Sequence, residues 1–420
     1  MDHSSNRHLV ACLSIVVTLV VGACGGTPTA EASVDPTLAP TPSAQPSALA
    51  SADSPPAPTE VAEPAATPRP RPVRWSTTPS VIFDEGCLSV VATVDGSGRF
   101  HVAAECSRGI GYATSADGEA WKASTLAPPS GRREVDPQLA ADGTTLYLAY
   151  TRLRPVDQDT CSGGYVNEDP AGIYYRTRAL PGGAWSKPTR LRGDGDHLQS
   201  FRVVNGVIHA TFRGDLGNGR VSYLSSDGST AHVIAMPGAE ATSLRVGDDG
   251  RPRIAFTSAG SVGYAVVSGG DRLQTTTVFE ADDVQLGSPV LVLGGGDHAF
   301  ISWMAAPLPG CEAPEPTHEG TWFATDADGR WAVKRLSRDI GAASLVVDVG
   351  TGTIHATYND RRGVRYDTRS ADGTWAGSRP DVPKGFEALT LRRDPGTGRL
   401  LLVGSKDGED DATICAVTAS

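Results

Sequence analysis

An internal repeat constrains the fold of this chain more than any other feature. The segment GVIHATF at 206–212 recurs as GTIHATY at 352–358 and, more loosely, as GRFHVAA at 98–104. Weaker copies centre on positions 147, 253, 300 and 401, so the units follow one another at intervals of about 46 residues, with two insertions. A period of this length is typical of propellers and other repeat architectures.

Each unit carries four short strand signals, named A to D here, bounded by Gly, Asp and Ser. Strand A of the first unit is LSVVATV at 88–94, and strand B is the recurring segment itself. Strand C holds an aromatic residue at one fixed place: Tyr112, Tyr175, Tyr223, Tyr264, Phe323 and Tyr366. Strand D begins with Trp in several units: Trp121, Trp185, Trp331 and Trp375. These units predict an all-β fold, a seven-bladed β-propeller of four-stranded blades.

The turns between strands C and D share one motif. They read SADGEAW at 115–121, TDADGRW at 325–331 and SADGTW at 370–375. Asp can accept bonds from backbone amides in such turns and Gly tolerates a positive φ. The motif resembles the degenerate Asp-box (BNR) repeat of sialidase-like propellers over residues 73–420. The resemblance implies the fold and says little about function, since many non-catalytic propellers carry these turns.

The last unit lacks one strand. Its strand signals cover 388–394, 399–404 and 412–419, and then the chain ends. Near the start of the domain, WSTT at 75–78 matches the strand D pattern WSK at 185–187. We therefore expect a propeller domain of residues 73–420 that is closed by its N-terminal strand, which would remove an exposed sheet edge.

Residues 1–23 resemble an export signal. The apolar run at 9–21 is too short for a membrane span, which needs about 20 residues. VGAC at 21–24 resembles the bacterial lipobox, which implies removal of residues 1–23 and diacylation of Cys24. The expectation is a lipoprotein anchored to the bacterial cell membrane through Cys24, on its extracytoplasmic side. The alternative is an ordinary signal peptide with a cysteine there by chance.

Residues 24–72 consist mostly of Pro, Ala, Ser and Thr and have no apolar periodicity. Such a composition cannot bury a core, so it predicts a disordered tether between anchor and propeller.

Charge and motifs exclude several classes of protein. With 48 acidic and 37 basic side chains, the net charge of −11 argues against nucleic-acid binding. No H-E-x-x-H, paired C-x-x-C, P-loop or G-x-S-x-G element occurs. The recurring His101, His209 and His355 occupy one repeat position on separate blades, so we expect structural roles and neither a metal site nor a cofactor.

The cysteines suit an oxidising compartment. Cys87 and Cys106 flank one hairpin symmetrically and are expected to bridge. Cys161 and Cys311 lie in the two insertions, and they can form a second disulfide only if both loops lean over the central axis. Cys415 falls at the strand C aromatic position and is expected to be a buried free thiol.

Both insertions, at 152–172 and 305–320, fall in B–C loops. In propellers these loops and the D–A loops form one face, which is therefore the expected binding face for a glycan or protein ligand. The candidate residues on it are Arg132, Arg133, Glu134, Asp136, Arg213, Asp215, Tyr358, Asp360, Arg361 and Arg362.

The resemblance to sialidases implies an arginine trio that grips a carboxylate, a Tyr nucleophile with a Glu partner, and an Asp acid/base. Arg133, Arg213 and Arg362 are the conceivable trio, because Arg binds carboxylates bidentately. However, the R-I-P segment of that family is absent from RPVRWSTTPSVIF at 71–83. We expect a non-catalytic binding or scaffold module; the alternative is an exo-sialidase-like glycoside hydrolase.

Overall fold

The computed structural model describes residues 73–419 except 85, 130–131, 156–167, 215–219, 227–230, 269–271, 309–315, 342, 381, 383 and 407–412. The described part is all-β, with one three-residue 3₁₀ helix, Gly295–Asp297. Within it, no helix has the length and apolar character needed to cross a membrane.

The strands form seven antiparallel sheets, each a blade, as expected from the repeat. The strands of each blade are given from the innermost to the outermost. Blade one is β2 (Cys87–Val94), β3 (Phe100–Cys106), β4 (Gly109–Ser115) and β5 (Lys122–Leu126). Blade two is β6 (Arg133–Asp142), β7 (Thr145–Pro155), β8 (Glu168–Ala179) and β9 (Thr189–Arg190). Blade three is β10 (His197–Val204), β11 (Val207–Arg213), β12 (Val221–Ser226) and β13 (Ala231–Met236).

The second half of the chain continues the pattern. Blade four is β14 (Ala241–Val246), β15 (Pro252–Ser258), β16 (Ser261–Ser268) and β17 (Arg272–Glu280). In blade five the inner strand is in two pieces, β18 (Val284–Leu286) and β19 (Val290–Leu293), which both pair with β20 (Ala299–Pro307), and β21 (Gly320–Thr325) and β22 (Ala332–Ser337) follow. Blade six is β23 (Ala343–Asp348), β24 (Thr353–Asp360), β25 (Gly363–Arg369) and β26 (Trp375–Ser378).

The seventh blade joins the two ends of the domain. Its sheet is β27 (Phe386–Arg393), β28 (Leu400–Lys406), β29 (Thr413–Ala419) and β1 (Ser80–Phe83). Strand β1 pairs antiparallel with β29, and Trp75 forms a further bridge to Ala419. The outer strand of this blade thus comes from the start of the domain, and it covers an edge of β29 that would otherwise be open to other chains.

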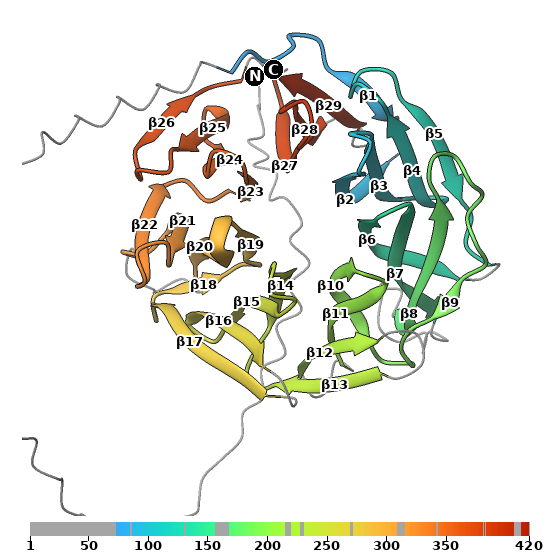
Figure 1. Cartoon of the computed structure of the whole chain (residues 1–420), viewed down its shortest axis with the longest axis horizontal. Helices are drawn as coiled ribbons and strands as arrows, with labels where there is room; N and C mark the ends of the chain where they lie inside the picture. The colour runs from blue at the N-terminus through green and yellow to red at the C-terminus, as the bar shows by residue number, and fades with distance from the viewer. Residues whose placement is uncertain are drawn as a thin grey trace, which may run out of the picture. The chain divides into compact units, whose positions relative to one another are not determined.

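The inner strands β2, β6, β10, β14, β19, β23 and β27 surround a central axis (Figure 1). Each contacts the next, and β27 contacts β2, so the ring of blades is closed. Apolar side chains fill the space between neighbouring blades, as in the cluster that joins Val102 and Ala113 of blade one to Leu401 and Val403 of blade seven.

The recurring histidines are buried inside their blades. The Nδ1 atom of each lies within hydrogen-bond distance of the hydroxyl of a strand C tyrosine. The pairs are His101–Tyr112 at 2.8 Å, His209–Tyr223 at 2.7 Å and His355–Tyr366 at 2.5 Å. They tie strand B to strand C, which is a structural role.

The cysteine predictions have different outcomes. Cys87 and Cys106 are directly opposite in the β2–β3 ladder and form the expected disulfide. Cys415 is free and buried, as expected. Cys24, Cys161 and Cys311 lie outside the described residues.

The turn at 115–121 and the start of strand D in blade two bear on the sequence predictions. In the turn at 115–121, the Asp117 carboxylate accepts hydrogen bonds from the amides of Glu119 and Ala120, which lower its pKa to about 2. Gly118 has a φ of 79°, as this turn requires. In blade two, strand D does not begin at Trp185, which makes only an isolated bridge to Arg178.

Candidate functional site

The candidates of blade two are spread along strand β6. Arg132 is exposed, and the Arg133 guanidinium forms an ion pair with Glu105 of blade one. Asp136 has a φ of 52°, and its carboxylate lies 3.8 Å from Nδ1 of His197. Arg133 and Asp136 share one neighbour, because the Glu105 carboxylate pairs with the Arg133 guanidinium and accepts a hydrogen bond from the backbone amide of Asp136.

Glu134 is buried, although Arg133 before it is exposed. Its Oε1 atom accepts a hydrogen bond of 2.6 Å from Nη2 of Arg152, and Nη2 of Arg176 lies 3.9 Å away. The Tyr150 hydroxyl accepts bonds from both arginines, at 3.3 and 3.2 Å. Tyr150 and Glu134 are 0% and 1% exposed, so this pair cannot meet a substrate as a nucleophile and its partner.

Tyr358 lies inside blade six instead of on the expected binding face. It is 0% exposed, and its hydroxyl donates a hydrogen bond of 2.5 Å to Oδ2 of Asp367. Alternation along β24 explains the difference, because Tyr358 follows Ala356 and Ile354 onto the buried face of the sheet. Burial raises the pKa of Tyr358 well above its ordinary value, and the hydrogen bond to Asp367 raises it further.

The other candidates of blade six sit in surface ion pairs. Asp360 accepts a hydrogen bond from the amide of Arg362 and pairs with Arg379, which lowers the pKa of Asp360. Arg361 is exposed and lies 2.9 Å from Asp339. Arg362 is exposed at the turn.

The structure gives the members of the conceivable trio, Arg133, Arg213 and Arg362, different surroundings. Arg133 pairs with Glu105 and Arg362 lies at the tip of the β24–β25 turn. Arg213 ends β11, and its Nε atom is buried without a hydrogen-bond partner. Asp215 lies outside the described residues.

A different set of arginines meets at the axis. A cavity of about 390 Å³ is lined by residues from the inner strands of all seven blades. One layer of it consists of the strand A residues that pair with the recurring strand B position: Thr93, Ala140, Arg202, Arg245, Val292, Val346 and Arg392. Four blades contribute small or aliphatic residues, which leave room for the three arginines of blades three, four and seven.

Strand alternation and the sheet edge position these arginines. Phe201, which precedes Arg202, is buried in the apolar cluster between blades two and three, so Arg202 extends from the other face of β10. Each arginine donates an Nη1 hydrogen bond to the carbonyl of its preceding residue. The three bonds are Arg202 to Phe201 at 2.6 Å, Arg245 to Leu244 at 2.8 Å and Arg392 to Leu391 at 2.6 Å. Innermost strands have unpaired carbonyls on the channel side, and these bonds satisfy them.

Burial lowers the pKa of all three arginines, and neighbouring guanidinium groups lower that of Arg202 and Arg245 further. Burial, and then Arg392, lower the pKa of Arg202 to about 9. Burial lowers the pKa of Arg392 to about 10. Burial, followed by Arg202 and Arg392, holds the pKa of Arg245 well below its ordinary value. Guanidinium groups stay protonated in proteins at neutral pH, so the cavity holds three like charges.

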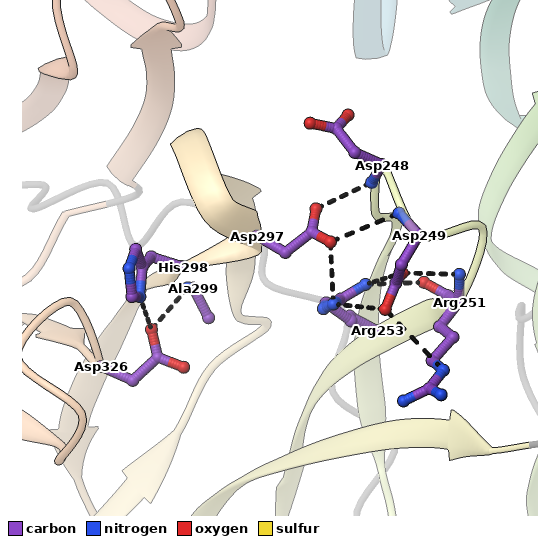
Figure 2. A network of polar contacts seen from close by, with 8 residues as sticks. All are labelled: Asp248, Asp249, Arg251, Arg253, Asp297, His298, Ala299 and Asp326. Carbon is purple, nitrogen blue, oxygen red and sulfur yellow. Dashed lines mark hydrogen bonds and ion pairs between the residues drawn. The ribbon is translucent and has the colours of Figure 1, made fainter.

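Two carboxylates line the same cavity at the A–B turns of blades four and five. Asp297 is engaged elsewhere: its carboxylate accepts hydrogen bonds from the amide of Asp248 at 2.8 Å and from Nη2 of Arg253 at 3.0 Å (Figure 2). Arg253 also binds Asp249, and this hydrogen bond is the main cause that lowers the pKa of Asp249 to about 2. The Asp248 carboxylate is exposed and points away from this network (Figure 2).

Neither carboxylate therefore bonds directly to the arginines. Among the residues that the structure describes, no carboxylate forms a hydrogen bond or ion pair with Arg202, Arg245 or Arg392. In the same residues, no group of three or more His, Cys, Asp or Glu side chains is arranged to bind a metal ion. The chemistry available in the cavity is anion binding by guanidinium groups.

The sequence carries a signal for this site in strand A. Each arginine follows a buried apolar residue near the end of strand A, in FRVV at 201–204, LRVG at 244–247 and LRRD at 391–394. Aligning strand A across the units places the three arginines at one repeat position, as strand B pairing does in the structure. The length of the B–C loops predicts a site on their face, whereas this cavity is lined by the A–B turn residues Asp248, Gly294 and Val349.

The chain is similar in structure to a protein of unknown function from Dyadobacter fermentans, with a TM-score of 0.53 and 12% identity over 83% of this chain and 99% of that one. Trypanosoma rangeli sialidase, in complex with the inhibitor DANA, gives a TM-score of 0.48 and 12% identity over 81% of this chain and 55% of the sialidase. The α-L-arabinofuranosidase of Fusarium graminearum gives 0.48 and 11% over 81% of this chain and 96% of that one.

These similarities concern the fold alone. The chain shares its overall fold with the Dyadobacter protein and spans about half of the sialidase's length. No family model and no curated protein matches the sequence.

Proposed function

We propose that this chain is a non-catalytic binding propeller that holds an anionic group of its ligand in the axial cavity, between Arg202, Arg245 and Arg392. One observation carries the proposal: three guanidinium groups share one cavity, and no carboxylate of the described residues accepts a bond from any of them. Partly buried like charges without a partner are unfavourable, and a bound anion supplies the missing charge.

The residues around the arginines support binding over catalysis. General acid–base or nucleophilic chemistry needs a titratable group or nucleophile beside the bound group. The described lining residues that could serve are Asp248, Asp297 and Thr93. Asp297 is held by Arg253, and a lone Thr hydroxyl has no adjacent base to activate it.

The test is anion-dependent stabilisation of the purified protein. Sodium sulfate, phosphate, acetate and chloride are compared at constant ionic strength by thermal unfolding, and binding is measured by calorimetry. We expect at least one anion to bind at a single site and to raise the melting temperature. In Arg202→Gln, Arg245→Gln and Arg392→Gln the binding should weaken about 10-fold or more, because a charge-assisted hydrogen bond contributes about 1.5–3 kcal/mol.

The control is Arg330→Gln, which removes an exposed arginine outside the cavity. It should bind anions as the unchanged protein does. Equal loss in Arg330→Gln, or no anion binding at all, would overturn the proposal.

The alternative function, an exo-sialidase-like hydrolase, has its own test. A panel of fluorogenic glycosides, sialosides included, should show no turnover. Turnover that is abolished by Arg213→Ala or Arg362→Ala would restore the hydrolase.

We also propose that the propeller is held at the extracytoplasmic side of a bacterial membrane by acylated Cys24. The sequence VGAC at 21–24 supports this proposal. Cys24→Ala should shift the protein out of the detergent phase in phase partitioning, and unchanged partitioning would contradict the anchor.

A further inference from the structure

The number of free donors in the axial cavity bears on the kind of anion that it takes. The Nη1 atoms of Arg202, Arg245 and Arg392 are used by carbonyls of their own strands. The Nη2 groups of all three have no acceptor in the described residues, and each carries two N–H donors. A carboxylate offers two oxygens to such a ring, whereas a phosphoryl group offers three, one for each guanidinium.

The charge of the cavity bears on the same question. The titratable groups that line it are Arg202, Arg245, Arg392, Asp248 and Asp297. Asp297 is balanced by Arg253, so Asp248 is the one acid in the described lining that offsets three positive charges. The cavity therefore has a local charge of about +2, which a monoanion would leave half balanced and a dianion would neutralise.

The lining bears on the part of the ligand that is recognised. Ala140, Val292 and Val346 lie in the arginine layer, and no aromatic residue is among the described residues of the cavity wall. A sugar ring or a base would therefore have no aromatic side chain to stack on. Recognition in the cavity falls on the anionic group, while Val349 at the A–B turn side is 70% exposed and leaves the mouth open to a substituent.

From these three observations we infer that the axial cavity takes a dianionic phosphoryl group, as inorganic phosphate or as a phosphate monoester. The inference rests on the proposed anion-binding function and specifies its ligand class. Three Nη2 groups bind the three terminal oxygens, and the two negative charges match the local excess of positive charge.

The decisive comparison uses two probes of nearly equal shape. Methyl phosphate is a dianion above its second pKa of about 6, whereas methyl sulfate is a monoanion. Calorimetry on the purified full chain at pH 8 and fixed ionic strength should give methyl phosphate at least about 10-fold tighter binding than methyl sulfate or acetate. Inorganic phosphate as a third probe distinguishes a free ion from an ester, because an ester-specific site binds methyl phosphate more tightly.

Protonation of the probe supplies an independent check. Lowering the pH from 8 to 5.5 converts methyl phosphate to a monoanion and should weaken its binding several-fold. Inorganic sulfate, which stays dianionic over this range, is the matched control and should bind almost equally at both pH values. Arg245→Gln lowers the cavity charge by one, so it should reduce the preference for methyl phosphate over methyl sulfate, while Arg330→Gln should keep it.

The outcomes separate the two levels of the proposal. Equal binding of methyl phosphate, methyl sulfate and acetate, all lost in Arg245→Gln, would overturn the dianion inference and leave the anion-binding function standing. Absence of binding by every probe would overturn the function itself.

Discussion

The indole of Trp75 packs edge-on against the ring of Tyr366, with centroids 5.3 Å apart and planes at 79°. Trp75 precedes the outer strand of blade seven, and Tyr366 lies in strand C of blade six. The same contact between a Trp and the strand C aromatic of the preceding blade recurs at three other junctions. These pairs are Trp185–Tyr112, Trp331–Tyr264 and Trp375–Phe323, with centroids 5.1–5.2 Å apart.

Trp75 is therefore predicted to stabilise the closure of the ring. Trp75→Ala should lower the free energy of unfolding by about 2–4 kcal/mol, since it deletes a large, partly buried ring. A double-mutant cycle of Trp75→Ala with Tyr366→Ala, measured by urea unfolding, should give about 0.5–1.5 kcal/mol of coupling. Tyr366→Phe is the conservative substitution at the same position.

Trp121 provides the contrasting case for that cycle. The strand C position of blade seven is occupied by Cys415, and Trp121 packs on aliphatic residues that include Leu401. Trp121→Ala should lose packing energy but show no coupling to Tyr366→Ala, because Tyr366 belongs to another cluster. A coupling at Trp121 as large as that at Trp75 would contradict the role assigned to the aromatic pair.

Repetition explains how much of the fold was predictable. His209 and His355 mark strand B and Tyr223 and Tyr366 mark strand C, and each histidine reaches the tyrosine of its own blade, so local pattern and tertiary packing agree. The match of Trp75 to Trp185 identified the strand pattern that starts the domain, because both make the same contact with a preceding blade. The Cys87–Cys106 disulfide was predictable because the two residues flank one hairpin symmetrically.

The site was less predictable because its residues meet only through ring closure. Arg202 and Arg392 are separated by 190 positions and lie together since their blades face one axis. The sequence YNDRR at 358–362 predicts that Tyr358 belongs to the binding face. The strand continues to Asp360, however, and this directs the Tyr358 side chain into the blade. Side-chain direction at the end of a strand depends on where the strand stops, which a single sequence defines poorly.

The buried histidines predict a loss of stability in mild acid. Burial lowers the pKa of His209 and of His355 to about 4, from 6.5 in the unfolded chain. Both therefore contribute stability above pH 6.5 that is lost as the pH falls from 6.5 through 4. Each contribution is at most about 3 kcal/mol. Nε2 of His355 is buried without a hydrogen-bond partner, so a proton there has no acceptor.

The measurement is urea unfolding between pH 7.5 and 4.5. The double variant His209→Gln/His355→Gln should show a flatter dependence of stability on pH across this window than the unchanged protein. Asp117, with a pKa of about 2, contributes below this window, whereas Glu105, Asp196 and Asp326, whose pKa burial raises, are present in both proteins and cancel in the comparison. An identical slope in the variant would rule out the histidines as its source.

The disulfide of blade one predicts a second, pH-independent effect. Cys87 and Cys106 are 19 residues apart in sequence, so their bond restricts a loop for which the chain-entropy model gives about 3 kcal/mol. Cys87→Ser/Cys106→Ser should lower the free energy of unfolding by about this amount in urea. Adding reductant should destabilise the unchanged protein by this amount more than the double variant, in which any remaining effect would report a second disulfide.

The last prediction concerns the uncompensated charge at the axis. Thr93 is the blade-one member of the layer that contains Arg202, Arg245 and Arg392, and it is partly exposed to the cavity. Thr93→Glu places a carboxylate among the three guanidinium groups. If their charge is unpaired, the variant should be more stable at low salt by about 1 kcal/mol or more, since charge-assisted bonds outweigh the cost of partial burial. It should also bind phosphate and sulfate at least about 10-fold more weakly, because the carboxylate occupies the donors. Thr93→Gln introduces a side chain of the same size as Glu but without its charge. It should show neither the gain in stability nor the loss of anion binding. A Thr93→Glu protein that is less stable than Thr93→Gln, and that still binds anions, would show that the arginines are already compensated in the native fold.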